Sequence, residues 1–319
     1  MRISIIGAGA VGSLLGGLLR CAGHDVSLLG RQAGETADRG LRIVLASEWL
    51  FCEGLRYGTP FADPDVHLVA LGRQHLHAFR RTDFARLVPG SAPVVFCNPD
   101  PAEPIRLGIP SGRWFSCLTL MNAVKLQDGE VEQTEGKPVI MVDRSSGLER
   151  LFGDLARFGF PTIAVPDMLP CLSSFFLWQL LSLPLALCHA TLSSFLSAPE
   201  GRELALSVLR EGIAAMESAD RPLVRLPVMD PRDLVSRLEG KPASFDRAQE
   251  EPGRSYNSML QCILRGRPTE AAQLNRKAVE MASAAGLHLT WNWRLLQKAG
   301  RMSSVGFYRT PAELLRALS

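Results

Sequence analysis

Three glycines near the amino terminus have the spacing of a dinucleotide-binding turn. Gly7, Gly9 and Gly12 form a G-x-G-x-x-G sequence between a short apolar stretch and a run of apolar residues at helical spacing. In this context Gly7 permits a tight bend, Gly9 lets a pyrophosphate approach the main chain, and Gly12 lets a helix pack closely on a strand. The first N–H groups of that helix would face the phosphates. The expected cofactor-binding residues of this turn are Gly7, Ala8, Gly9, Ala10, Val11 and Gly12. The alternative is a glycine-rich turn in an α/β fold that holds no nucleotide.

The residue after the second predicted strand discriminates between two nicotinamide dinucleotides. The strand is expected over residues 26–29, and Gly30 and Arg31 follow it. An NAD site usually has Asp or Glu here, bonded to the ribose 2′-hydroxyl. A carboxylate would repel a 2′-phosphate, whereas a guanidinium binds it through paired hydrogen bonds. The sequence therefore favours NADP(H) over NAD(H); the alternative is that Arg31 is a solvated surface residue.

A β-α-β unit within a larger sheet must position these residues. Ligands in open α/β sheets bind outside the carboxyl ends of the strands, so Arg73 and Asn98, which each follow a predicted strand, are expected to face the cofactor. A solvated loop position explains Arg73 equally well. Turns are predicted at Gly129, Gly136 and Gly147, and a helix over 75–87. Apolar stretches predict strands over residues 3–6, 26–29, 41–46, 66–71, 93–97, 114–120, 139–142 and 162–165.

The pattern changes near residue 166, after which no strand is predicted. Residues 168–199 contain no Asp, Glu, Lys or Arg, and residues 175–196 are almost wholly apolar. A transmembrane helix needs about 20 apolar residues, but polar residues interrupt this stretch and no basic flank orients it. We therefore expect a helix buried on all sides in an all-α domain. Further helices are predicted over 201–218, 231–238, 256–264, 269–285 and 289–298.

The composition is that of an ordinary globular protein. The chain is long enough for two domains, which we expect to be a Rossmann-type domain over residues 1–166 and a helical domain over residues 167–319. Hydrophobic residues make up 46%, charged residues 21%, and the net charge is +3. No basic stripe with interleaved aromatics suggests nucleic acid. The seven scattered cysteines never form C-x-x-C, which argues against a disulfide framework or a metal site. The first apolar run is too short for a signal peptide. A cytoplasmic protein is expected, with a small-molecule substrate and neither nucleic acid nor membrane as a partner.

These features together resemble the ketopantoate reductase (2-dehydropantoate 2-reductase) family over the whole chain. Residues 257–261 look like the family's serine–methionine helix, and Glu270 and Asn275 lie in a segment like its T-E-x-x-x-x-N sequence. The resemblance implies that Glu270 contacts the ribose on the nicotinamide side. It also implies that Asn98 lies where cofactor and substrate meet, and that Ser258 and Asn275 bind substrate.

The resemblance fails at the family's proton donor. The family's central helix reads W-x-K-L-x-x-N-x-x-x-N, in which the lysine donates the proton and the asparagines hold the substrate. The corresponding residues here are Leu180, Pro184 and Cys188. Leu180 cannot donate a proton, and Pro184 is expected to kink the helix. His189 and Asn98 are the remaining candidates, although we favour a second interpretation of His189, as a buried histidine bonded to a backbone carbonyl.

Three functions are compatible with the sequence. We favour an NADP(H)-dependent oxidoreductase that transfers hydride to a small 2-keto acid or related carbonyl, with an altered proton donor. The second is an NADP(H)-binding protein that has lost turnover and acts by sensing or by binding a partner. The third is ordinary ketopantoate reduction, with the central helix assigned a residue or so out of register. A role in pantothenate biosynthesis is implied by the resemblance alone, and a homodimer is compatible with all three.

Overall fold

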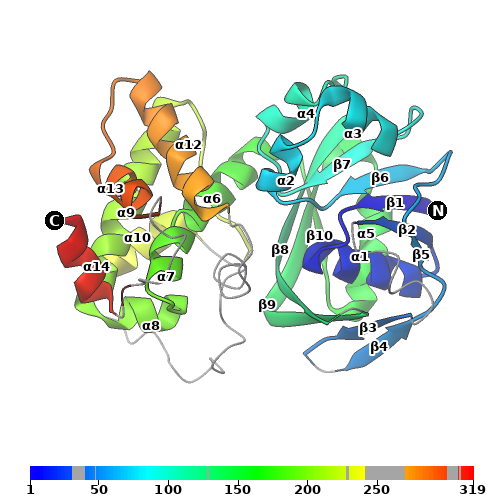
Figure 1. The fold of residues 1–319 in the computed structure, drawn as a ribbon, viewed down its shortest axis with the longest axis horizontal. Coiled ribbons are helices and arrows are strands. Elements are labelled where there is room, and N and C mark those ends of the chain that lie inside the picture. The colour runs from blue at the N-terminus through cyan, green and yellow to red at the C-terminus, as the bar shows by residue number, and fades with distance from the viewer. Residues whose placement is uncertain are drawn as a thin grey trace. The chain divides into compact units, whose positions relative to one another are not determined.

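The chain forms two compact units, Met1–Met168 and Leu169–Ser319 (Figure 1). The first unit ends close to the boundary predicted at residue 166. The computed structural model describes residues 1–30, 40–46, 48–127, 129–227, 230–240, 270–299, 308 and 310–319. Arg31, Ser258 and the helix predicted over 256–264 lie outside the described residues.

The first unit is built on a ten-stranded sheet with the order β4-β3-β9-β8-β7-β6-β1-β2-β5, and β10 pairs with β9. The β3–β4 and β8–β9 pairs are antiparallel, and the other pairs are parallel. This mixed sheet confirms the predicted Rossmann-type unit. The strands are β1 (Arg2–Ile6), β2 (Asp25–Leu29), β3 (Leu41–Val44), β4 (Trp49–Cys52), β5 (Arg56–Tyr57), β6 (Val66–Val69), β7 (Val94–Cys97), β8 (Trp114–Gln127), β9 (Glu130–Asp143) and β10 (Thr162–Val165).

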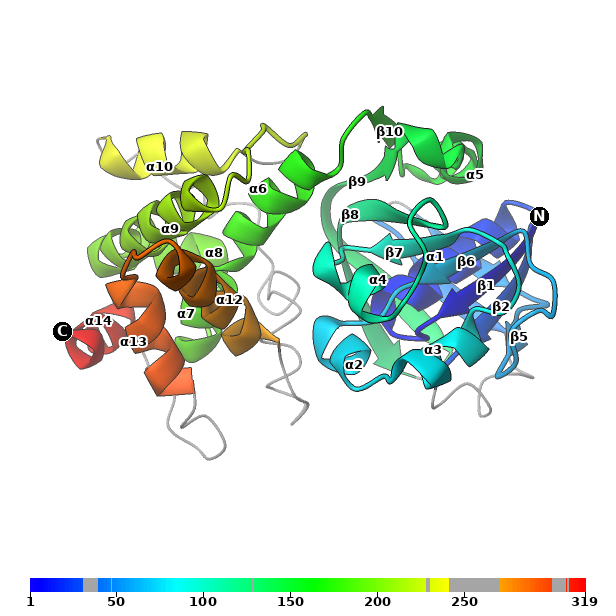
Figure 2. The same cartoon turned by 90° about the horizontal axis from the view of Figure 1, so that it is seen from above.

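Alternating side chains along the strands build an apolar core on each face of the sheet. On β1, Ile3 and Ile5 pack in one cluster and Ile6 in another, as the period of two in a strand requires. The first face carries α1 (Ala10–Cys21), α5 (Glu149–Gly153) and the short 3-10 helices η1 (Arg144–Ser146) and η2 (Asp154–Phe158). The other face carries α2 (Arg73–His77), α3 (Arg81–Leu87) and α4 (Ala102–Arg106), as Figures 1 and 2 show.

Several elements of this unit differ from their predicted extents. The helix predicted over 75–87 is two helices, because Arg80 is extended (φ −79°, ψ 155°) between α2 and α3. The strands predicted over 114–120 and 139–142 continue into the long β8–β9 hairpin, whose charged residues hide the strand pattern. The turn predicted at Gly136 is therefore wrong, since its backbone belongs to β9, whereas Gly129 and Gly147 do lie outside the strands with φ of +82° and +66°. Strands β4 and β5 were not predicted.

The described part of the second unit is helical and packs around one long helix, α9. Its Leu204, Ala205, Val208 and Leu209 are fully buried. The helices predicted over 201–218, 231–238, 269–285 and 289–298 all correspond to observed ones. The helices are α6 (Leu169–Gln179), α7 (Ser182–Leu187), α8 (Leu192–Ser197), α9 (Pro199–Ser218), α10 (Pro231–Glu239), α12 (Ala271–Ala284), α13 (Thr290–Ala299) and α14 (Pro311–Leu318).

The single helix predicted over 175–196 is wrong, because the segment forms α6, α7 and α8 in succession. Pro184 lies in the first turn of α7 and has no N–H to continue the helical ladder from α6. The stretch Leu169–Leu187 is long and apolar enough to cross a membrane by composition alone, but 72% of it is buried within the protein. That burial agrees with the expectation of a core segment, and a core helix of a soluble protein passes the same test.

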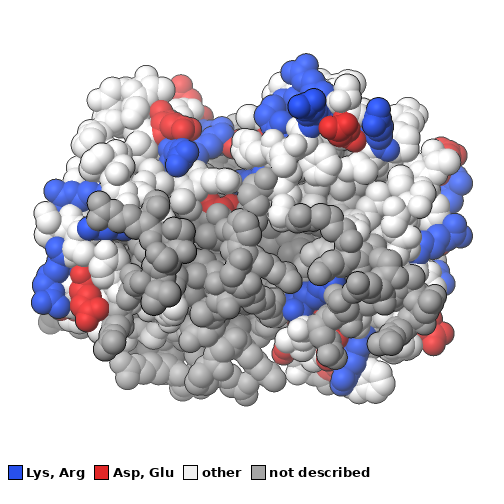
Figure 3. All heavy atoms as spheres, in the orientation of Figure 1, with Lys and Arg blue, Asp and Glu red and all other residues white. Residues whose placement is uncertain are grey.

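Charged side chains on the face drawn in Figure 3 lie in small groups among uncharged residues. Where Figure 3 draws described residues, several Lys and Arg side chains lie beside Asp or Glu.

Candidate functional site

The ends of three neighbouring strands meet where the sheet changes direction. Strand β1 lies between β2, which follows it in the chain, and β6, which pairs with its other edge. The Gly7 N–H donates to the Leu29 carbonyl at 2.8 Å, and the Ala70 N–H donates to the Ile6 carbonyl at 2.8 Å. A reversal of strand order such as this is where open α/β sheets bind their ligands.

The three motif glycines have different roles in this turn. Gly7 has a φ of +117°, and a Cβ built on it would lie 2.5 Å from the Ala70 carbonyl oxygen. A Cβ on Gly12 would lie 1.8 Å from the Gly7 carbonyl oxygen. Gly9 is exposed, and a Cβ there would meet nothing within 4 Å. Gly7 and Gly12 are therefore needed for the turn itself, whereas Gly9 leaves space open above it.

Helix α1 presents its amino terminus at the same place. Gly9 is its N-cap, no side chain caps it, and its first turn contains no acidic residue. Ala10 and Val11 are half-buried in that turn. Ala8 packs closely against Gly30, since a Cβ built on Gly30 would lie 2.6 Å from the Ala8 Cβ. Uncapped N–H groups and the helix dipole attract an anion. The residues present therefore fit a pyrophosphate held against the main chain at Gly9.

Arg73 and Asn98 both follow strands that end beside this turn. Arg73 begins α2 and is half-buried. Asn98 follows β7 with a φ of +53°. Its Oδ1 accepts the Thr119 N–H at 2.7 Å, and its Nδ2 donates to the Thr119 Oγ1 at 2.9 Å. Asn98 thus joins the end of β7 to β8, and Thr119 was not predicted because its place depends on strand register, with Cys97 opposite Cys117.

The buried carboxylate of Glu103 and the half-buried guanidinium of Arg106 fix the short helix α2. The Arg106 guanidinium donates to the carbonyls of Leu76 at 2.6 Å and Phe79 at 3.1 Å. It also donates to the carboxylate of Glu103 at 2.9 Å, and the other oxygen of Glu103 lies 3.1 Å from the His77 Nε2. Helix α4 therefore holds the end of α2 in place, and with it the segment that carries Arg73.

The predicted substrate residue Asn275 is fully buried in the second unit. Its Nδ2 lies 2.8 Å from the Asn292 Oδ1 and 3.4 Å from the Leu180 carbonyl oxygen, in the break between α6 and α7. The Glu211 carboxylate accepts hydrogen bonds from the Asn292 Nδ2 and from the main-chain N–H of Trp291. The Asn275 Oδ1 has no partner among the described residues. Glu211 and Asn292 were not predicted as site residues. The one feature of the sequence that points to them is the polar amide of Asn292 between Trp291 and Trp293.

Leu180, Pro184 and Cys188 lie in apolar core; the resemblance matches them to the family's lysine and asparagines. Leu180 is fully buried, and a Cβ on Gly212 would lie 2.6 Å from its Cδ1. Pro184 and Cys188 are buried as well. A lysine at position 180 would therefore place an ammonium group among leucines, at a high desolvation cost.

His189 and Glu270 occupy more open positions. His189 is exposed with a φ of +48°, so the buried histidine that we favoured from the sequence is wrong. Glu270 is half-buried and precedes α12, where its carbonyl accepts the N–H groups of Gln273 and Leu274. Within the described ranges, no group of three His, Cys, Asp or Glu residues is arranged to hold a metal ion.

Comparisons with known proteins agree with this architecture. Residues 3–145 match the family described as ketopantoate reductase PanE/ApbA, and residues 178–302 match its C-terminal family. The chain is 28% identical to the 2-dehydropantoate 2-reductase of Pyrococcus abyssi, over 93% of this chain and 97% of that relative. It is 24% identical to the 2-dehydropantoate 2-reductase of Pyrococcus horikoshii, over 96% and 99%.

Two solved structures show the same fold. A PanE/ApbA family ketopantoate reductase from Ralstonia eutropha JMP134 has a TM-score of 0.78 at 18% identity, covering 95% of this chain and 98% of that one. D-mandelate dehydrogenase in complex with NADH has a TM-score of 0.77 at 17% identity, covering 96% and 100%. With family matches over both units and a Rossmann-type turn, the chain belongs to the ketopantoate reductase family of nicotinamide-dinucleotide-dependent oxidoreductases.

Proposed function

We propose that this protein reduces a small 2-keto acid or related carbonyl with NADPH. The observation that carries the proposal is the open space at Gly9 beside the uncapped start of α1, at the reversal of strand order. A pyrophosphate bound there accepts main-chain hydrogen bonds, and the helix dipole favours its charge. The curated relatives are named 2-dehydropantoate 2-reductases, and a structural neighbour is a mandelate dehydrogenase; the acids in these names are 2-keto and 2-hydroxy acids.

The preference for NADPH rests on Arg31. It follows Gly30, whose backbone lies against Ala8 of the glycine turn, and the sequence has no Asp or Glu at residues 30–32, directly after β2. A guanidinium in this position recognises the 2′-phosphate that distinguishes NADPH from NADH.

Titration of the full chain with each dinucleotide, followed by nicotinamide fluorescence, tests this preference. We expect Arg31→Ala to weaken NADPH binding by about tenfold or more, the scale of a lost charge-assisted hydrogen bond, and to leave NADH binding nearly unchanged. Arg42→Ala, which removes an exposed arginine on β3, serves as the control. Equal losses of both dinucleotides in Arg31→Ala would contradict the assignment.

The proton donor differs from the family's lysine in this proposal. Hydride transfer to a carbonyl carbon leaves charge on oxygen, and a positioned acid typically contributes about 10²–10⁴ in rate. Leu180 carries no such group and is buried, whereas His189 is exposed and carries an imidazole, a side chain that can donate a proton in general acid catalysis. His189 is therefore the donor that we propose, and His189→Asn is expected to lower kcat while leaving the dissociation constant of NADPH unchanged.

A second function is favoured by the apolar surroundings of Leu180, Pro184 and Cys188. A family member without polar groups at these positions could hold NADPH and act by sensing or by binding a partner. Incubation of the NADPH complex with ketopantoate and a panel of 2-keto acids separates the two functions. Oxidation of NADPH by any member supports the enzyme, and tight binding with no oxidation supports the binding protein. A homodimer is part of both proposals, and a relative from Staphylococcus aureus is a dimeric ketopantoate reductase.

A further inference from the structure

Two cysteines at the far end of α1 form a contact that the nucleotide site does not use. Cys21 is the last residue of α1 and Cys52 the last residue of the edge strand β4. Their thiols lie within hydrogen-bond contact, both in the reduced form. Helix α1 has twelve residues, so at about 1.5 Å per residue this pair lies roughly 18 Å from Gly9. Any chemistry of the pair is therefore separate from phosphate binding.

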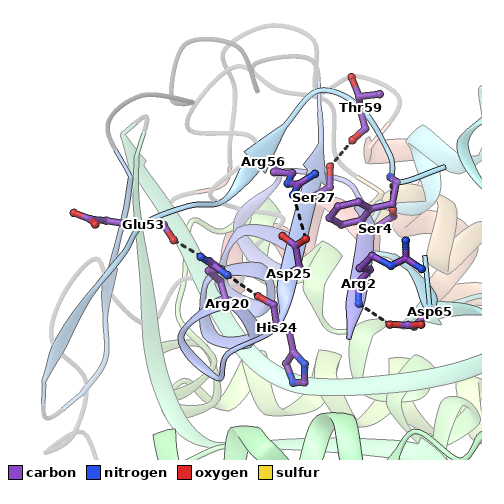
Figure 4. A network of polar contacts seen from close by, with 11 residues as sticks. Arg2, Ser4, Arg20, His24, Asp25, Ser27, Glu53, Arg56, Thr59 and Asp65 are labelled. Carbon is purple, nitrogen blue, oxygen red and sulfur yellow. Dashed lines mark hydrogen bonds and ion pairs between the residues drawn. The ribbon is translucent and has the colours of Figure 1, made fainter. Parts of the chain in front are cut away.

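Neighbouring hydrogen bonds hold the two main chains together at this point. Arg20, which precedes Cys21, donates from Nε to the carbonyl of Glu53, which follows Cys52, at 2.9 Å. Its Nη1 donates to the His24 carbonyl at 3.1 Å (Figure 4). The Arg157 guanidinium donates to the Cys21 carbonyl at 2.8 Å. The segments that carry the two cysteines are thus held next to each other by hydrogen bonds that do not involve sulfur.

The two thiols differ in exposure and acidity. Cys21 is half-buried, whereas Cys52 is only 2% exposed. The hydrogen bond from Cys52, helped by the charges of Arg157 and Arg20, lowers the pKa of Cys21 to about 7 against the opposing effect of burial. The same hydrogen bond and burial raise the pKa of Cys52. The accessible sulfur is therefore the one that ionises first, and the thiolate is the form that attacks a disulfide.

We propose that Cys21 and Cys52 form a thiol–disulfide site, in which Cys21 attacks a low-molecular-weight disulfide and Cys52 resolves the product. In the first step the Cys21 thiolate attacks one sulfur of the disulfide, which gives a mixed disulfide on Cys21 and releases one thiolate. In the second step Cys52 loses its proton to solvent and attacks the Cys21 sulfur, which releases the second thiolate. The two cysteines are oxidised by two electrons, and the small disulfide is reduced to two thiols.

The sheet contains a second thiol pair that serves as an internal control. Cys97 and Cys117 lie directly opposite each other on β7 and β8, and their thiols are also in hydrogen-bond contact. Cys97 is 8% exposed and Cys117 fully buried, and contact with Cys97 together with burial raises the pKa of Cys117. Proximity alone would make both pairs react; exposure and acidity select only Cys21–Cys52.

Oxidised glutathione is the probe that tests the proposal on the full-length protein. All variants carry Cys262→Ser, since that thiol lies outside the described residues. Intact mass and peptide mapping at pH 7 are expected to show a Cys21–Cys52 disulfide in this parent protein. Cys52→Ser is expected to stop at a stable glutathione adduct on Cys21, and Cys21→Ser to remain unmodified. Cys97→Ala is expected to behave like the parent.

The rate of alkylation by iodoacetamide in the Cys52→Ala and Cys97→Ala proteins adds a quantitative test. In the intact pair, kept in Cys97→Ala, a pKa of about 7 for Cys21 against 9.0 for an unperturbed thiol gives about fifty times the thiolate at pH 7. Lower nucleophilicity offsets this about tenfold, so Cys21 should react about fivefold faster than a peptide thiol. Cys52→Ala should return that rate to the peptide value. The proposal is overturned if Cys21 in the intact pair reacts no faster than a peptide thiol, or if its glutathione adduct persists with Cys52 present.

Discussion

Gly9 and Gly12 belong to one motif but are glycine for different physical reasons. A side chain on Gly12 would collide with the main chain of the turn, at 1.8 Å from the Gly7 carbonyl oxygen. A side chain on Gly9 would meet nothing in the protein. The sequence motif does not distinguish these roles, because it records only the residue type and its spacing. The structure separates a glycine required by packing from one required by the ligand.

Alanine substitutions at these two positions should therefore affect different properties. Gly9→Ala should change the free energy of unfolding by less than about 1 kcal/mol, since Gly9 has an extended backbone that alanine also adopts (φ −76°, ψ −172°), and should weaken NADPH binding by tenfold or more. Gly12→Ala should lower the free energy of unfolding by about 1–3 kcal/mol, the usual cost of overpacking. Urea unfolding and calorimetric titration measure the two effects. Wild-type NADPH affinity in Gly9→Ala would contradict the placement of the pyrophosphate.

His67 is a residue whose importance lies in stability rather than in the site. It lies fully buried in the middle of β6, and its Nε2 is 3.0 Å from the Pro89 carbonyl oxygen. Burial lowers its pKa below the ordinary value of 6.5, and the nearby charge of Arg113 acts in the same direction, against the hydrogen bond to Pro89. The unfolded chain therefore binds a proton at His67 more readily than the folded chain does.

This difference predicts a loss of stability in acid. The contribution of neutral His67 is fully present above pH 6.5 and is lost as the pH falls toward the depressed folded pKa, at up to about 1.4 kcal/mol per pH unit. His67→Phe should flatten the curve of unfolding free energy against pH between 7 and 5. His288→Gln, which removes an exposed histidine, should leave the curve unchanged. His24, whose pKa is also lowered by burial, retains its share of the slope in both variants. An unaltered slope in His67→Phe would refute the account.

At the scale of elements, the sequence predicts those parts whose pattern is local. The turn after β1 and the helix α1 follow from glycine spacing and apolar periodicity within twenty residues. The broken helix α6–α7–α8 does not, because an apolar run has no periodicity from which a break can be inferred. Pro184 predicts a kink, but the separation of α6 from α7 also depends on Asn275, which lies on α12 and bonds to the freed carbonyl of Leu180. Such a partner is distant in sequence and leaves no local signal.

Asn275 should accordingly contribute to the stability of the second unit. Asn275→Ala leaves the Leu180 carbonyl and the Asn292 Oδ1 without their donor, and each buried unpaired group costs about 1–3 kcal/mol. Gln273→Ala, which removes an exposed amide from the same helix, should be neutral. Urea unfolding of the two variants measures the difference. The family resemblance makes Asn275 a substrate residue instead. If that is its role, Asn275→Ala should raise KM for the keto acid and leave the free energy of unfolding unchanged.

At the scale of the whole molecule, the two units differ in how far the sequence describes them. The cofactor turn of the first unit could be predicted because the chain order β1-α1-β2 brings its residues together directly. In the second unit, the resemblance matches Leu180, Pro184 and Cys188 to the family's lysine and asparagines but does not show where their side chains lie. The structure buries all three in apolar core. These three residues are four apart, a spacing that would put them on one face of a continuous helix. In the broken helix their side chains point where packing partners such as Gly212 of α9 allow.

Amide hydrogen exchange on the full chain tests the site as a whole. With NADPH at 100 times its dissociation constant, binding stabilises the folded protein by about 2.7 kcal/mol. We expect the strongest added protection in segments 7–21, 66–77 and 94–98, because these carry the turn, α1 and the ends of β6 and β7. The peptide that contains Glu270 should also gain protection if this residue contacts the ribose, as the family resemblance implies. Segment 311–318, which forms α14, provides the internal reference and should change least.

The same measurement on Gly9→Ala distinguishes specific from general stabilisation. If the pyrophosphate lies at Gly9, this variant should lose the added protection in segment 7–21 at an NADPH concentration that protects the wild-type protein. A global stabilisation that spreads equally over both units, including α14, would show that ligand binding and unfolding are coupled through the whole chain. Protection of segment 270–284 without segment 7–21 would contradict the site, because the phosphates would then bind away from the turn at Gly9.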